Sequence, residues 1–109
     1  MGVQWLKAQI ENHDRIISTS FPGGRCLKIE YRLESGGSAE EIVYIPDGQE
    51  YLIGDDVIDR VAGLGVTLIV PSHFSKVTGA AKMYGRTRNI RVLDNMKQFF
   101  AILHAGDSY

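Results

Sequence analysis

Cysteine is almost missing from this chain, because Cys26 is the only one among its 109 residues. A disulfide within these residues is therefore impossible, and a zinc site built from several cysteines is excluded. No apolar run is long enough to cross a membrane, and the N-terminus lacks the basic flank and apolar stretch of a secretion signal. We therefore expect a soluble, cytoplasmic protein that makes no membrane contact.

An excess of charge of one sign is also missing. The 12 basic and 13 acidic residues leave a formal net charge of −1. Such a chain does not coat nucleic acid through bulk charge, although a local basic patch remains open. The composition is that of an ordinary globular protein, with 44% hydrophobic and 23% charged residues. The length predicts one domain over 1–109, with a tail at 105–109 and a core that needs no metal or disulfide cross-link.

The chain is predicted to open with a helix and a strand. Val3, Leu6 and Ile10 fall on one face of a helix, with Trp5 at its flank. The β-branched residues of "RIISTSF" predict a strand, which ends at the turn residues "PGG".

Two further strands follow. Strict alternation in "RCLKIEYRLES" predicts a strand with one packed face and one wet or functional face. The packed face carries Leu27, Ile29, Tyr31 and Leu33, and the opposite face carries Cys26, Lys28, Glu30, Arg32 and Glu34. "EEIVYIP" is predicted to pair with it antiparallel, and Pro46 marks the end of that strand or an edge position.

The second half is predicted to alternate helices with strands. "EYLI" fits either a short strand or a loop, and Asp55 or Asp56 is expected to cap the next helix. The apolar positions of that helix are Val57, Ile58, Val61 and Ala62. The continuous apolar run "VTLIV" predicts a strand that is covered on both faces.

The last elements are predicted to complete a βαβ unit and a closing helix. Ser75 is the expected cap of a helix that turns Val77, Ala80, Ala81 and Tyr84 inward. "NIRVLD" is the next strand, parallel to "VTLIV" through a right-handed crossover. Asp94 is the expected cap of a final helix whose buried stripe is Met96, Phe99, Phe100 and Leu103. The sequence therefore predicts an α/β mixed-sheet sandwich in the order α-β-β-β-α-β-α-β-α.

The stretch "DDVIDRVAGLGVTLIVPSHFSKVTGAAKMYGRTRNIRVLDNMKQFF" resembles the later half of the methyl-directed, Mrr-like group of restriction endonucleases. The first half is similar to that fold only in topology. The resemblance implies a restriction-endonuclease-like fold. It also implies an acid on the second strand and an (Asp/Glu/Gln)-x-Lys pair on the third, where the acids hold a divalent metal that activates water.

The resemblance places Glu30 about where the first acid falls, as metal ligand, with Lys28 as the nearest lysine. The third strand departs from the motif, because Tyr44 and Pro46 stand at its aligned positions. We therefore expect a nuclease-fold module without catalysis and without a cofactor, which binds nucleic acid or a protein partner. The alternative is an Mg²⁺-dependent endonuclease with a rearranged site that uses Glu30.

Two groups of residues outside that motif could bind anions. The basic residues that could contact phosphates are Lys76, Lys82, Arg86, Arg88 and Arg91. The other interpretation is a solvated helix face with cations near a helix C-terminus. The loop after "VTLIV" could bind an anion through Ser72, His73 and Ser75, or could simply cap the next helix.

A third hypothesis gives this chain no nucleic-acid role. An early strand that is exposed at the edge of a sheet can pair with a second copy. A structural or oligomerising domain, with a homo-oligomer as its assembly, is therefore also open.

Overall fold

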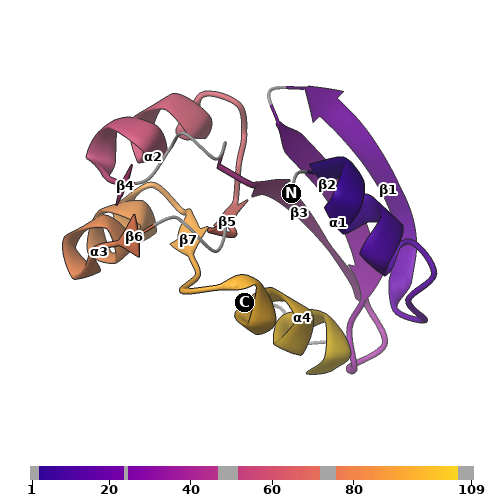
Figure 1. Cartoon of the computed structure of the whole chain (residues 1–109). Coiled ribbons are helices and arrows are strands. Elements are labelled where there is room, and N and C mark those ends of the chain that lie inside the picture. The colour runs from indigo at the N-terminus through magenta and orange to yellow at the C-terminus, as the bar shows by residue number, and fades with distance from the viewer. Residues whose placement is uncertain (1–2, 24, 47–51, 72–75, 106–109) are drawn as a thin grey trace.

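A computed structural model describes residues 3–23, 25–46, 52–71 and 76–105. The chain forms a five-stranded mixed sheet with helices on both faces (Figure 1). The order of elements is α1 (Val3–Ile10), β1 (Ile16–Gly23), β2 (Cys26–Arg32), β3 (Ser38–Tyr44), β4 (Leu52–Ile53), α2 (Asp55–Ala62), β5 (Leu68–Ile69), β6 (Lys76–Val77), α3 (Gly79–Thr87), β7 (Arg91–Val92) and α4 (Met96–Ala105). Among the described residues, no helix has the length and apolar character needed to cross a membrane.

The main sheet has the strand order β1-β2-β3-β5-β7. Strands β1, β2 and β3 pair antiparallel, whereas β3, β5 and β7 run parallel. This confirms the predicted mixed sheet and the βαβ unit, in which α3 connects β5 to β7. The short strands β4 and β6 form a separate parallel pair that the sequence pattern did not predict.

One face of the main sheet is covered by α1 and α4. The buried residues of this first core include Leu6 and Ile10 from α1, Phe99 and Leu103 from α4, and Leu27, Ile29 and Tyr31 from β2. The predicted packed face of β2 is therefore confirmed. Ile102 also belongs to this core, although the predicted stripe of α4 did not include it.

The other face is covered by α2 and α3. Their buried residues Val57, Ile58, Val61 and Ala81 pack with the buried residues Tyr44, Ile69 and Val92 of the sheet and with Cys26. The prediction of one wet face on β2 is wrong at Cys26, which is 2% exposed. Cys26 lies opposite Tyr44 in the β2–β3 register, so the second core covers this end of the face. Burial raises the pKa of the Cys26 thiol, which keeps it protonated and unreactive.

The start of α3 differs from the prediction. Thr78 caps this helix, and its side-chain oxygen accepts a hydrogen bond of 3.0 Å from the Ala81 amide. The predicted cap Ser75 lies outside the described residues, and Val77 precedes the helix in β6. Ala80 is exposed rather than turned inward, because the inward face of α3 is formed by Ala81, Tyr84 and Gly85.

The predicted caps of α2 and α4 are also wrong. Gly54 occupies the cap position of α2 without a side-chain hydrogen bond, and Asp55 and Asp56 stand in the first turn. Their negative charge still favours that helix end. In α4, Asn95 rather than Asp94 accepts the Gln98 amide, at 3.0 Å. This helix includes Ala105, the first residue of the predicted tail at 105–109, and 106–109 lie outside the described residues.

Candidate functional site

The residues predicted for catalysis lie on β2. The face of β2 that carries Lys28 and Glu30 also carries Cys26, on the side of the sheet away from α1 and α4. Glu30 lies directly opposite Glu40 in the β2–β3 register and accepts a long hydrogen bond of 3.4 Å from the Ser38 hydroxyl. Lys28 pairs with Glu40, with 3.3 Å between Nζ and Oε1. The structure thus brings a second carboxylate beside Glu30.

Two carboxylates are a sparse donor set for a catalytic metal. In the described parts of the chain, no three His, Cys, Asp or Glu side chains come close enough to hold an ion together. Lys28 also neutralises one of the two carboxylates. Glu30 and Glu40 could hold a hard divalent cation only with several water molecules completing its coordination.

The five predicted basic residues do not form one patch. Lys82, Arg86 and Arg91 lie together along β7, which is an edge strand of the sheet. Arg88 turns toward α2 and forms an ion pair of 3.8 Å with Asp59, which also accepts a hydrogen bond of 2.5 Å from the Tyr84 hydroxyl. Lys76 belongs to β6 in the separate two-stranded sheet. The structure therefore brings Lys82, Arg86 and Arg91 together and places Arg88 and Lys76 elsewhere.

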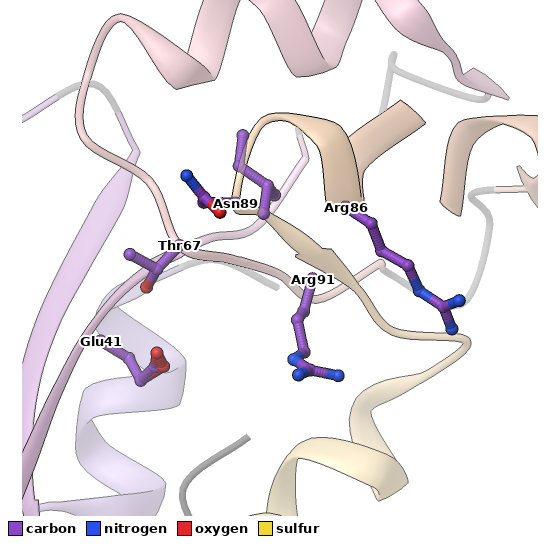
Figure 2. A pocket seen from close by; sticks show the side chains of 6 residues that line it. Glu41, Thr67, Arg86, Asn89 and Arg91 are labelled. Carbon is purple, nitrogen blue, oxygen red and sulfur yellow. The ribbon is translucent and has the colours of Figure 1, made fainter. Parts of the chain in front are cut away.

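Arg86 and Arg91 line a hollow of about 540 Å³ at the amino ends of β5 and β7 (Figure 2). The other lining residues come from β3, from the residue before β5 and from the turn before β7: Glu41, Thr67, Asn89 and Ile90. A volume of this size is sufficient for a small organic ligand. We name this space the Arg86–Arg91 hollow.

A second, smaller space of about 150 Å³ continues from the same two arginines. Its further lining residues are Lys82, Val92, Leu93, Asp94 and Gln98. Lys82 forms an ion pair with Asp94, which also accepts a hydrogen bond of 3.0 Å from the Gln98 side chain. These hydrogen bonds, the one from Lys82 first, hold the pKa of Asp94 below its ordinary value. This network connects α3 to the start of α4 beside the arginines.

Glu41 is the most unusual lining residue. On β3 it stands in a row with Ala39, Val43 and Ile45, all of which contact the first core. It is half-buried, and its position opposite Ile29 would suit an apolar side chain. Burial raises the pKa of the Glu41 carboxyl, while a side-chain hydrogen bond from Thr67 and the charge of Arg91 act in the opposite direction. A half-buried carboxyl group whose pKa is raised by burial, in a hollow that also holds an arginine, is a candidate functional group.

The close approach of α3 to β7 fixes the position of the two arginines. Gly85 is buried, and its carbonyl accepts hydrogen bonds from the amides of Arg88 and Ile90, at 2.9 and 2.8 Å. Asn89 has a φ of 59°, a left-handed conformation that asparagine tolerates better than most residues. This tight turn returns the chain beside the end of α3, and Arg86 and Arg91 both line the same hollow.

The second predicted anion site consists of residues that the structure does not describe. Ser72, His73 and Ser75 follow β5 and fall outside the described residues. Open α/β sheets usually bind ligands at the carboxyl ends of their parallel strands, which is where this loop begins. The Arg86–Arg91 hollow lies at the opposite, amino ends of β5 and β7.

The comparisons with known proteins add no relative. No family model, curated protein or solved structure matches this chain. Three lining residues were missed as site residues by the sequence analysis: Glu41, Thr67 and Asn89. The interruption of the apolar row of β3 by Glu41 is the sequence signal that could have indicated one of them.

Proposed function

We propose that this chain is a nuclease-like module without catalysis that binds nucleic acid through its phosphates at the Arg86–Arg91 hollow. The observation that carries the proposal is that Arg86 and Arg91, from α3 and β7, line the same two adjoining spaces. Guanidinium groups are always charged and donate paired hydrogen bonds that match phosphate geometry. Lys82 extends the positive charge along the edge of the sheet.

The described contacts of β3 support the absence of the usual nuclease chemistry. Tyr44, which stands at a motif position, is 4% exposed, and its hydroxyl accepts a hydrogen bond of 2.8 Å from Arg60. Pro46, at the other motif position, is buried and offers neither a metal ligand nor a base. Catalysis at Glu30 would therefore need a lysine and a second acid from other positions, and Lys28 and Glu40 are the residues that lie beside it.

Binding to labelled duplex DNA is expected to weaken steeply with salt. If two to three phosphates are contacted, the affinity should fall roughly 12- to 40-fold between about 50 and 200 mM salt, because bound counterions are released from the duplex. Fluorescence anisotropy of the labelled duplex measures this slope. The duplex is expected to stay intact with Mg²⁺, with Mn²⁺ and with chelator.

Two results would replace this proposal. Metal-dependent cutting that is abolished in Glu30→Ala would favour the rearranged endonuclease. A stable dimer that binds neither DNA nor RNA would favour the structural role, with β1 as the exposed edge strand through which copies pair. Binding that does not change with salt would also contradict the phosphate contacts.

A further inference from the structure

The Arg86–Arg91 hollow has two chemically different ends. Figure 2 shows Glu41 and Arg86 on opposite sides of Arg91, with Thr67 beside Glu41. The arginine end, extended by Lys82, is cationic and suits an anion. The Glu41 end offers oxygen atoms of a carboxylate and of side chains that accept hydrogen bonds.

A carboxylate beside a phosphate site needs a physical reason, because like charges repel. Glu41 also lies in an apolar row, where an ionised group loses hydration. The hydrogen bond from Thr67 and the charge of Arg91 offset part of these costs, and a ligand that places hydrogen-bond donors between its phosphate and Glu41 would offset more of them. An ionised carboxylate only accepts hydrogen bonds, so the ligand group at this end must carry an O–H or N–H.

The hydroxyl groups of a ribose meet this need better than a base does. Bases are usually held by stacking on aromatic side chains. None of the described residues that line the two spaces is aromatic. In contrast, a carboxylate that accepts a hydrogen bond from a ribose 2′-hydroxyl is a common arrangement in nucleotide sites.

We propose that the hollow holds a ribose–phosphate unit, with the phosphate at Arg86 and Arg91 and the 2′-hydroxyl at Glu41, so that the chain prefers RNA to DNA. This inference rests on the proposed function and specifies its substrate class. The recognition is independent of base sequence, because only the sugar and the phosphate are contacted. The 2′-hydroxyl is the group by which a protein distinguishes RNA from DNA at one site.

Single strands of about 12 nucleotides and identical base sequence test the proposal. RNA is expected to bind about tenfold more tightly than DNA that carries uracil, since one hydrogen bond to a charged group is gained. RNA with 2′-fluoro substitution keeps the ribose pucker but lacks the donor, and is expected to bind as DNA does. Fluorescence anisotropy gives the three affinities.

Glu41→Ala is expected to reduce the ratio of the RNA affinity to the DNA affinity to about one, because RNA loses a hydrogen bond that DNA does not make, and the affinity for RNA is expected to fall. Glu40→Ala is the matched control, because Glu40 directly precedes Glu41 in β3 and lies on the other face of that strand. If Glu41 acted only through its charge, its removal would raise the affinity for RNA and for DNA alike. That result would overturn the inference.

The remaining outcomes separate the two proposals. Equal affinity of the unsubstituted protein for RNA and DNA, with salt-sensitive binding retained, would overturn the ribose inference and leave the proposed function intact. Absence of binding to every strand would overturn both. If 2′-fluoro RNA binds as tightly as RNA, the preference for RNA would come from the pucker of the sugar, and the role of Glu41 would be contradicted.

Discussion

Replacement of both arginines, Arg86→Glu and Arg91→Glu, is expected to weaken nucleic-acid binding by at least about 100-fold at about 50 mM salt. Each substitution removes a charge-assisted hydrogen bond to phosphate, and each such bond contributes about 1.5–3 kcal/mol. Each also places a negative charge where the phosphate lies. The slope of log affinity against log salt concentration should become shallower by the amount that about two phosphate contacts contribute.

A control double variant carries the same change of charge at two residues outside the hollow. Lys97→Glu and Arg32→Glu replace exposed residues that line neither space, on α4 and β2. This control is expected to weaken binding only slightly, through long-range charge that salt screens. Equal losses in both double variants would show that net charge, rather than the hollow, governs binding. Thermal unfolding of all variants checks that the fold persists.

Gly85→Ala is expected to lower the free energy of unfolding by about 1–3 kcal/mol, although alanine ordinarily stabilises a helix by up to about 1 kcal/mol over glycine. A Cβ atom at this position would lie 2.8 Å from the Ile90 carbonyl oxygen and 3.0 Å from Cγ2 of Val92. The first contact is with backbone, so α3 would have to move away from β7. Urea unfolding measures the loss.

Gly79→Ala makes the same change in the same helix and should have a different result. A Cβ atom on Gly79 meets nothing within 4 Å, so stability is expected to stay equal or to rise by less than about 1 kcal/mol. Equal responses at the two glycines would contradict the close contact between α3 and β7. Because this contact positions Arg86 and Arg91, Gly85→Ala should also weaken binding.

The periodicity of apolar residues predicted which faces of the strands and helices are buried better than it predicted where the helices begin. The alternation in β2 identified Leu27, Ile29 and Tyr31 as core, because a buried sheet face requires apolar residues at every second position. Caps were misplaced because neighbouring polar residues share the same chemistry. Thr78, three residues after Ser75, and Asn95, directly after Asp94, have the backbone geometry that selects the true cap.

The candidate site was only partly predictable for a related reason. Lys82 and Arg86 are four residues apart on a helix, so their shared face follows from sequence. Arg91 joins them only through the turn at Asn89, and Glu41 joins through the pairing of β3 with β5. Strand order decides such contacts between distant segments, and the residue pattern of single strands does not encode it.

The order of the strands also has a consequence for how the chain assembles. The meander β1-β2-β3 closes only short loops, whereas β5 and β7 join the sheet after the longer connections through α2 and α3. Long loops cost more entropy to close, so the β7 edge is expected to form last and to open first. The Arg91 amide donates to the Thr67 carbonyl, and the Leu93 amide donates to the Ile69 carbonyl. In native-state hydrogen exchange, these two amides should exchange sooner than the amides of β2. Uniform protection would contradict this order. A ligand that bridges β3, α3 and β7 would hold closed the part of the fold that otherwise opens first.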